Sequence, residues 1–535
     1  MSIECLAKSE DFSDGAPAQE YDFEFALSDI KAGEERYAII TKGKNSVSNL
    51  TIPNQVEAYV WTNGQYEPHT FCVKEIGDGA FWSLSNNESI LESVVLGDQI
   101  EKIDVYAFKN CKLLKSIVMP GVKSIGKEAF GDCSNLSEVN MPAVETIGDG
   151  AFMKCESLEN IALPQSLNHI GSSAFSGCIK ITSIELPETL TEIEASSFSN
   201  CNLKEIYIPN SVKTIGTNAF GKNAELKEVV IPATVTSIQQ NPFTGCSALT
   251  SIIVESGTPT YDSRDNCNAI IETATNTLIA ACNTSVIPNG IESIGAFAFY
   301  YTSITSLDLP ETVKSIGYCA FSYCSNLESI HICKNVASIG SSAFYWCGKL
   351  SSIIVDSYNE VYDSRNNCNA IIETKSDKLI VGGSNTIIPE GIKAIEMDAF
   401  INCEGLTSIT IPASVTEIGS NAFASCKNLT DVTNNATTPQ SISDNVFDIE
   451  YLSGYTYLMI NKTLHVPAGT RDTYKQSAIW TKFVKIIEEG NGSANIENIT
   501  SAYEDNTTSY NLQGMKVDNN YKGIVIINGK KILKK

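Results

Sequence analysis

The chain has 535 residues, of which 43% are hydrophobic and 19% are charged, and this composition supports a sizeable core and excludes a disordered tail or a fibre. Because 38 basic and 62 acidic residues leave a net charge of −24, we expect no nucleic-acid partner and no direct membrane insertion or membrane-surface binding. No run of residues is apolar enough for a spanning helix.

The first segments differ from everything that follows them. Residues 1–35 are expected to be an N-terminal extension, and their opening, MSIECLAKSE, lacks the basic and then apolar stretches of a leader. Residues 36–75 run through YAIITK and LTIPNQV, which indicates an irregular cap. We therefore expect a capped array that begins near residue 76.

A short repeat fills residues 76–489. It is visible in IGDGAF at Ile76–Phe81 and in IGSNAF at Ile418–Phe423. We call its phenylalanine the repeat Phe, and its spacing is 22 or 23 residues except for one step of 27 and two of 56. A period of this length is typical of leucine-rich repeats. The repeat Phe residues are Phe81, Phe108, Phe130, Phe152, Phe175, Phe198, Phe220, Phe243, Phe299, Phe321, Phe344, Phe400 and Phe423.

Each unit carries a strand pattern after its repeat Phe. Examples are Leu114–Pro120 (LKSIVMP), Leu203–Pro209 (LKEIYIP) and Leu406–Pro412 (LTSITIP). Alternate side chains of a strand point to opposite faces, and proline ends the strand because it cannot donate to a ladder. The predicted fold is mostly β, a right-handed leucine-rich repeat solenoid with a parallel sheet along one face. Glycines such as Gly126 and Gly216 suit a tight corner in each turn.

The two steps of 56 residues mark two inserted cassettes, residues 255–294 and 356–395. YDSRDNCNAIIET at Tyr261–Thr273 recurs as YDSRNNCNAIIET at Tyr362–Thr374, an offset of 101 residues. In each cassette two apolar runs flank a polar turn, as in AIIETATNTLIAAC at Ala269–Cys282, which predicts a hairpin.

The chain is expected to close with a C-terminal cap at 445–489, in which Thr463–Pro467 is the last strand and AGTRDTYKQSAIWTKF a short helix. Residues 490–509 are a polar linker. Residues 510–535 carry Asn528-Gly529 between two apolar runs, the signal of a β-hairpin, so a small C-terminal β segment is predicted.

The pattern AFGDCSNLSEVNMPAVETIG at Ala129–Gly148 closely resembles the repeats of BspA-like leucine-rich repeat proteins of Bacteroidetes and other host-associated microbes. The resemblance covers about residues 36–490. The cassettes and the tail from YNLQG to KGIVIINGKKILKK resemble segments of secreted members from Bacteroidetes, in which such tails resemble C-terminal sorting or anchoring segments. The resemblance implies a cell-surface or extracellular protein that binds host matrix proteins or other cells, with no catalytic motif to carry over.

Ten cysteines, which we call the cysteine column, lie three residues after a repeat Phe. A buried corner that needs one hydrogen bond to the turn backbone suits cysteine, so we expect reduced, buried thiols. Scattered disulfides or metal binding are the alternatives, although no CxxC pair is present. Asn223 and Thr302 hold the same position and can supply the same contact. The column is Cys111, Cys133, Cys155, Cys178, Cys201, Cys246, Cys324, Cys347, Cys403 and Cys426.

An aromatic group interrupts a polar corner of the repeat. We call the place two residues after the repeat Phe the corner position, and most turns carry Asn, Asp, Lys or Gly there. Three successive turns carry aromatic residues instead. Rings stacked for stability, or packed against the cassettes, would explain them; a ligand-binding site is the other interpretation. The candidate ligand-binding residues are Tyr300, Tyr301, Tyr318, Tyr323, Tyr345 and Trp346.

Catalysis finds little support in the sequence. His69, His169, His331 and His465 lie in different turns and form no triad or metal-ligand spacing. In Asp262–Asn266 (DSRDN), turn formation is a better interpretation than calcium binding, because Arg264 occupies a ligand position.

We therefore expect a non-enzymatic adhesion or ligand-binding protein, monomeric and without a cofactor or metal, whose partner is a host extracellular protein or glycan. Glycan binding in nutrient capture is the alternative function, and an acidic glycoside hydrolase is the second alternative.

Overall fold

The computed structural model describes residues 21–28, 35–43, 47–62, 65–83, 89–448, 450–451, 458–489, 509–511, 516–517, 523–527 and 530–534. The chain divides into two compact units, residues 1–350 with 355–362 and residues 351–354 with 363–535, and each is described by itself. Most of the predicted N-terminal extension and almost all of the predicted linker lie outside the described residues. In the described part, no helix is both long and apolar enough to cross a membrane.

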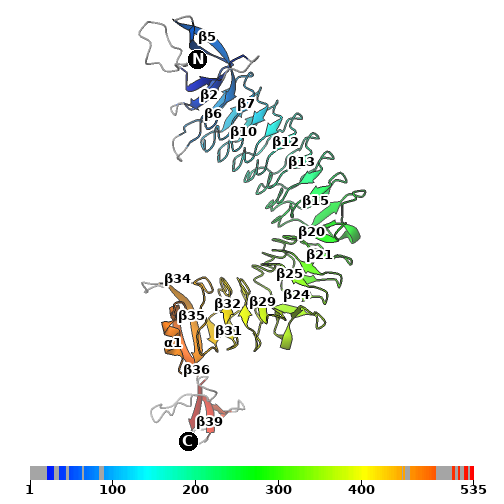
Figure 1. Ribbon diagram of the computed structural model, residues 1–535, viewed down its shortest axis with the longest axis vertical. Coiled ribbons are helices and arrows are strands. Elements are labelled where there is room, and N and C mark those ends of the chain that lie inside the picture. The colour runs from blue at the N-terminus through cyan, green and yellow to red at the C-terminus, as the bar shows by residue number, and fades with distance from the viewer. Residues whose placement is uncertain are drawn as a thin grey trace. The chain divides into compact units, whose positions relative to one another are not determined.

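The strand predicted after each repeat Phe forms a parallel ladder from turn to turn (Figure 1). Val94, Ile117 and Val139 lie side by side in it, as the alternation of buried and outward side chains requires. Its strands are β3 (Asn49–Ile52), β6 (Ser93–Leu96), β8 (Ser116–Val118), β10 (Glu138–Asn140), β15 (Glu228–Ile231), β17 (Ser251–Val254), β22 (Ser306–Asp308), β24 (Ser329–Ile332), β26 (Ser352–Val355), β31 (Ser408–Ile411), β33 (Asp431–Asn434) and β35 (Leu458–Pro467).

A second parallel ladder runs along the Ile-Gly segments, which were not predicted to be strands. Ile103, Ile125 and Ile147 pair in register, and the Gly126 amide donates to the Ile103 carbonyl at 2.7 Å. Where both ladders are present, each turn is therefore held to the next on two sides. Its strands are β7 (Lys102–Ile103), β9 (Ser124–Ile125), β11 (Thr146–Ile147), β12 (His169–Ile170), β13 (Glu192–Ile193), β14 (Thr214–Ile215), β16 (Ser237–Ile238), β21 (Ser293–Ile294), β23 (Ser315–Ile316), β25 (Ser338–Ile339), β30 (Ala394–Ile395) and β32 (Glu417–Ile418).

One predicted strand is wrong. Leu203–Pro209 is not a strand, and neither are the matching segments of the two turns before it. Ile206 and Ile208 are still buried while Tyr207 is 63% exposed, so the alternation holds without a ladder. Burial of alternate side chains does not require backbone pairing with the neighbouring turn. Here the Lys204 amide donates one hydrogen bond to the Thr182 carbonyl, at 3.0 Å, and no strand ladder forms.

The repeat Phe rings form the centre of the core. Phe108 and Phe130 stack with centroids 5.3 Å apart and planes 2° apart, and the neighbouring pairs repeat this arrangement. Phe447 extends the stack beyond Phe423, at 5.2 Å, although its step of 24 residues left it out of the predicted column. Burial of these rings supplies much of the apolar area that stabilises each turn.

The Ile-Gly glycine is required by close approach of the preceding turn. A Cβ on Gly126 would lie 2.6 Å from the Asp104 carbonyl carbon, and one on Gly216 would lie 2.5 Å from the Ala195 nitrogen. Neither glycine has the positive φ of a left-handed corner. Any other side chain would therefore push two turns apart.

The hairpin predicted in each cassette is confirmed. In the first, β18 (Tyr261–Asp262) and the 3₁₀ turn η1 (Arg264–Asn266) lead to β19 (Ala269–Glu272), which pairs antiparallel with β20 (Thr277–Ala281). The second repeats this with β27 (Tyr362–Asp363), η2 (Arg365–Asn367), β28 (Ala370–Glu373) and β29 (Lys378–Gly382). β20 and β29 then pair in parallel with β21 and β30, so each cassette hairpin begins the stretch of the second ladder that follows it.

Both ends carry irregular β structure. At the first end, β1 (Phe23–Leu27) pairs with β2 (Ala38–Gly43), and β4 (Gln55–Thr62) with β5 (Gln65–Ile76). At the other end, β34 (Glu450–Tyr451) and β36 (Phe483–Glu489) pair with β35, and α1 (Arg471–Gln476) and η3 (Trp480–Lys482) bury Tyr474 and Trp480. The predicted C-terminal β segment contains β37 (Ser509–Asn511), β38 (Lys516–Val517), β39 (Gly523–Ile527) and β40 (Lys530–Lys534).

Candidate functional site

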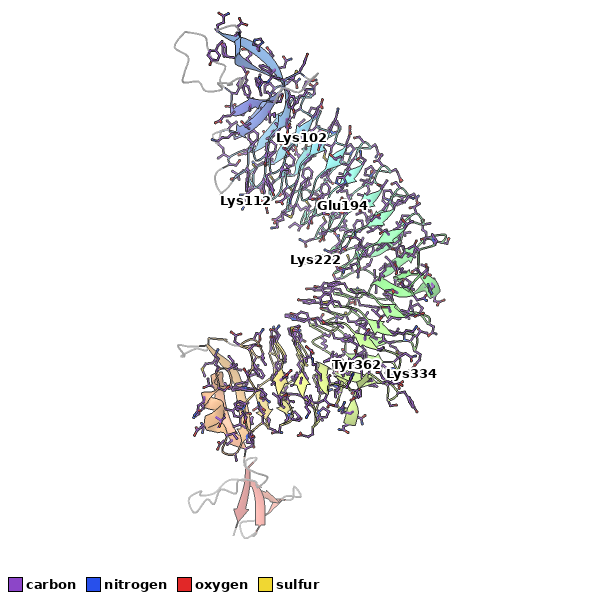
Figure 2. The ribbon with its side chains drawn as sticks, in the orientation of Figure 1. Lys102, Lys112, Glu194, Lys222, Lys334 and Tyr362 are labelled. Carbon is purple, nitrogen blue, oxygen red and sulfur yellow. The ribbon has the colours of Figure 1, made fainter. Side chains whose placement is uncertain are left out.

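The aromatic residues at the corner position come together as one stack in the first unit. Tyr301 and Tyr323 lie face to face, with centroids 4.4 Å apart and planes 4° apart, and Trp346 lies 5.5 Å from Tyr323 at 32°. In an earlier turn Lys222 holds the same position, and Figure 2 labels it at the margin of the stacked turns. The sequence placed these residues in one column, and the structure brings their rings into contact.

The other candidate residues surround Tyr323. Tyr300 and Tyr345 meet its ring edge to face, each at 5.5 Å. Between them in the same column lies Ser322, whose small side chain is 1% exposed. We infer that this serine gives the flanking rings room to lean toward Tyr323.

Sequence reasoning missed one member of this group. Phe297 lies two residues before its repeat Phe and packs against Tyr300 at 5.3 Å and against Tyr318 at 5.4 Å. Only positions after each repeat Phe were compared, so Phe297, which precedes its repeat Phe, was overlooked. The repeated Ala-Phe pair in AFAF at 296–299 is the signal that could have identified it. We call the seven residues together the aromatic patch: Phe297, Tyr300, Tyr301, Tyr318, Tyr323, Tyr345 and Trp346.

The corner position has a left-handed backbone. In every repeat from Phe108 to Phe423 its φ lies between 54° and 81°, and it is 62°, 60° and 61° at Tyr301, Tyr323 and Trp346. Glycine, asparagine and aspartate tolerate this conformation, whereas other residues are strained by roughly 1–2 kcal/mol each. Stacked ring pairs contribute a similar roughly 0.5–1.5 kcal/mol, so the aromatic residues gain little stability over asparagine.

Two buried polar groups in and beside the patch also lower the stability of the fold. Among the described residues, the indole nitrogen of Trp346 and the hydroxyl of Ser322 are buried without a hydrogen-bond partner. Each such group costs about 1–3 kcal/mol of desolvation. Stability alone therefore does not account for the aromatic patch.

The patch is partly open to solvent, although some of its ring faces are covered by neighbouring rings. Tyr301 and Tyr323 cover each other's faces, because they stack along the direction in which the turns follow one another. Tyr301 is 43% exposed and Tyr318 is 53% exposed. Burial raises the pKa of Tyr300 to about 12 and also raises the pKa values of Tyr301 and Tyr323, so these phenols remain hydrogen-bond donors at neutral pH.

The patch is almost uncharged on a strongly acidic chain. Its three corner segments, residues 296–304, 318–326 and 341–349, contain one charged residue, Lys349, at their last position. Lys349 donates to the Asn326 side-chain oxygen at 2.9 Å. Aromatic enrichment together with charge depletion is the composition of a protein interface core.

The cysteine column is buried as the sequence predicted. All ten side chains are free thiols, 7% exposed or less. The Cys324 thiol donates to the Phe299 carbonyl of the preceding turn at 3.1 Å, and most of the column repeats this contact. Burial raises the pKa of Cys324 to about 12, so the thiol keeps its proton and its role as donor.

The two substitutes in the column behave differently. The Asn223 amide donates to the Phe198 carbonyl of the preceding turn at 3.0 Å, as predicted. The Thr302 hydroxyl instead donates within its own turn, to the Phe299 carbonyl at 2.8 Å. The segment directly before this turn is the first cassette, which carries no repeat Phe.

The family model described as the BspA type leucine rich repeat region matches the chain in six copies, over residues 42–148, 74–178, 145–270, 264–372 and 382–464. The chain belongs to the BspA-type leucine-rich repeat family. No curated protein matches it.

Solved structures similar to this BspA-type protein come from several bacteria. A leucine rich cell surface protein of Faecalibacterium prausnitzii is 29% identical with a TM-score of 0.49, over 79% of this chain and 96% of that one. A leucine-rich repeat protein of Bacteroides ovatus is 23% identical, with a TM-score of 0.36, over 77% and 94%. The pneumococcal vaccine antigen PcpA is 17% identical, with a TM-score of 0.38, over 88% and 98%.

The remaining sequence candidates of this BspA-type protein are structural. Arg264 binds the Asp262 carboxylate at 2.7 Å, which fixes the DSRDN turn. No group of three or more potential metal ligands is present in the described residues.

His331 lies 3.5 Å from Asp308, with 41% of its side chain exposed. Cys319 and Cys333 are buried and Cys72 is half-buried, while Cys5 lies outside the described residues.

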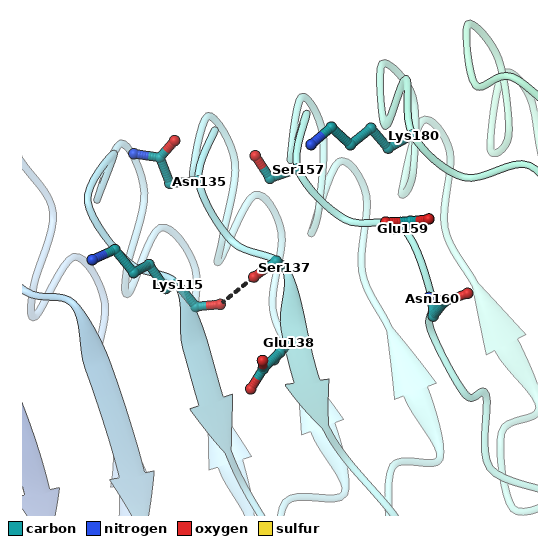
Figure 3. A pocket seen from close by; sticks show the side chains of 8 residues that line it. All are labelled: Lys115, Asn135, Ser137, Glu138, Ser157, Glu159, Asn160 and Lys180. Carbon is teal, nitrogen blue, oxygen red and sulfur yellow. Dashed lines mark hydrogen bonds between the residues drawn. The ribbon is translucent and has the colours of Figure 1, made fainter.

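A polar hollow of about 570 Å³ lies where the first ladder ends at β10 (Figure 3). Its charges balance, because Lys115 and Lys180 face the same space as Glu138 and Glu159. The Ser137 hydroxyl donates to the Lys115 carbonyl at 3.2 Å across it. The hollow is wide open to solvent and was not predicted from the sequence.

Proposed function

We propose that this chain is a non-enzymatic binding protein of the cell surface or extracellular space, and that it captures a protein partner on the aromatic patch. The observation that carries the proposal is an uncharged, tyrosine-rich surface on a chain of net charge −24. Tyrosine and tryptophan are enriched where proteins bind one another, and charged residues are depleted there.

Ring orientation favours a protein over a glycan. Sugars stack on exposed aromatic faces, whereas Tyr301 and Tyr323 cover each other's faces. Ring edges carry partial positive charge, and phenol hydroxyls donate hydrogen bonds. Backbone carbonyls and aromatic side chains of a polypeptide match both features.

The unpaired indole nitrogen of Trp346 supports a role in binding. The left-handed backbone is common to all corners, including Lys154 and Lys222, but at Trp346 it is combined with an unpaired buried indole nitrogen, and unsatisfied groups of this kind are typical of functional sites. Asparagine, which holds the corner position at Asn110 and Asn200, would avoid them.

The test is a binding screen of the intact protein against a panel of extracellular matrix proteins and a glycan array. Glycans retained on the protein are also examined for new reducing ends. We expect capture of at least one protein, no glycan capture and no hydrolysis. Glycan capture without protein capture would support the nutrient-capture alternative, and new reducing ends would overturn the non-enzymatic assignment.

A further inference from the structure

His465 lies between two carboxylates at the C-terminal end of the solenoid. Its Nδ1 is 2.6 Å from the Glu489 carboxylate and its Nε2 is 3.1 Å from the Asp431 carboxylate. The three residues come from three neighbouring strands, β36, β35 and β33. A carboxylate only accepts hydrogen bonds, so both contacts form together only when both ring nitrogens carry protons.

The neutral ring has one N–H and must therefore give up one carboxylate. Asp431 keeps another partner, because the Thr430 hydroxyl donates to it at 2.7 Å. Glu489 has no other hydrogen bond or ion pair among the described residues, and 58% of its side chain is exposed. Glu489 is thus the carboxylate that the neutral ring releases.

The backbone at this point adds little to hold Glu489. β35 and β36 pair in parallel, and Glu489 lies opposite Pro467, which has no N–H to donate. The preceding residue, Glu488, accepts a bond from the Arg471 amide of α1 at 2.9 Å. The side-chain bridge to His465 is therefore the main attachment of the last residue of β36.

We propose that protonation of His465 is a pH-dependent clamp, which holds the end of β36 in acid and releases it when the ring becomes neutral. The segment it controls leads directly into residues 490–508 and the C-terminal strands. Release would leave the last residue of β36 without its side-chain attachment.

The charges around the clamp determine its pH range. Burial lowers the pKa of His465, but the hydrogen bonds to Asp431 and Glu489 raise it above the ordinary histidine value of 6.5. Lys485 on β36 is a further charged group, and its positive charge helps to lower the pKa of Asp431. The clamp is complete below about pH 6.5 and is lost as the pH rises through the raised pKa of His465.

Hydrogen exchange of the full chain, corrected for the intrinsic pH dependence of exchange, tests the clamp. Between pH 5 and pH 9 we expect the protection of residues 486–489 to fall, because the bridge to Glu489 is complete at low pH and is lost as the pH rises through the raised pKa of His465. Constant protection across this range would overturn the proposal.

Single-residue variants test whether the pH dependence of protection comes from the bridge between His465 and Glu489. His465→Gln should keep low protection at every pH, and so should Glu489→Ala, which retains the histidine but removes the acceptor. His331→Gln is the matched control, because it removes an exposed strand histidine in another turn, and it should behave as the unmodified protein does. A pH-dependent fall in His465→Gln equal to that of the unmodified protein would overturn the proposal. Nitrogen NMR of the unmodified protein should show His465 doubly protonated at pH 6, and a neutral ring there would also contradict it.

Discussion

Tyr301 and Tyr323 stack on the surface at 4.4 Å, directly outside the buried stack of Phe299 and Phe321 at 5.0 Å. Two ring stacks thus lie on the two sides of one corner. The inner stack belongs to the repeat and recurs in almost every turn. The outer stack is confined to the aromatic patch.

Replacement of Tyr301 tests the left-handed strain. Tyr301→Asn and Tyr301→Val both remove the ring, but asparagine tolerates a φ of 62° and β-branched valine does not. We expect the valine variant to be less stable than the asparagine variant by about 1–2 kcal/mol, measured by urea unfolding. Equal midpoints for the two variants would contradict a strained corner.

The thiols of the cysteine column should not react with alkylating reagents in the native protein. Burial raises the pKa of these thiols, for example to about 12 in Cys246, so little reactive thiolate exists at pH 8. Alkylation followed by mass spectrometry should label Cys72 in the folded protein and all column cysteines only in denaturant. Native labelling of the column, or disulfides found after unfolding, would refute the buried-donor interpretation.

Asn223 offers a test of the donor in this column. Its amide donates to two carbonyls, of Phe198 and Phe220, and its oxygen accepts from the Leu203 amide. Asn223→Ala leaves these groups unsatisfied, at about 1–3 kcal/mol for each one that water does not reach. Asn223→Cys restores the donor to Phe198 and should recover part of the loss. The prediction fails if cysteine is no better than alanine in thermal unfolding.

Phe321→Ala should damage the solenoid locally. Phe321 is fully buried and stacks on Phe299 and Phe344, and loss of such a ring costs about 3–5 kcal/mol. Because repeats contact mainly their neighbours, hydrogen-exchange protection should fall in the turns next to residue 321 and persist in the turns around residue 130. Uniform loss along the first unit would show that the turns unfold together.

The sequence predicted the core of this fold well because its repeat is physically simple. A fixed spacing of Phe and Cys requires that each turn place them alike, so the buried rings and a hydrogen bond from the thiol to the backbone were predictable from position, whereas the acceptor of Cys324, the Phe299 carbonyl of the preceding turn, was not. The second ladder was missed because a two-residue strand such as Ser124–Ile125 is too short to show alternation. Leu203–Pro209 has full alternation and no ladder, because hydrophobic pattern reports burial and not backbone pairing.

The aromatic patch was predicted in part. The column position identified Tyr301, Tyr323 and Trp346, but ring orientation depends on χ angles that the sequence does not reveal. The same limit hid Phe297, which reaches Tyr300 from the opposite side of the repeat Phe. The preference for Asn and Gly at the corner position did contain the signal of its left-handed backbone.

The most direct test of the binding role is the affinity of a corner variant for a protein that the intact chain captures. The variant carries Tyr301→Asn, Tyr323→Asn and Trp346→Asn, and its matched control carries Lys154→Asn, Asn200→Ser and Lys222→Asn at the same position of other turns. We predict at least a tenfold loss of affinity in the aromatic variant, about 1.4 kcal/mol, with a melting temperature within a few degrees of the unmodified protein. The control should bind normally. Full affinity in the aromatic variant, together with a clear fall in its melting temperature, would show that these rings stabilise the solenoid and that the partner binds elsewhere.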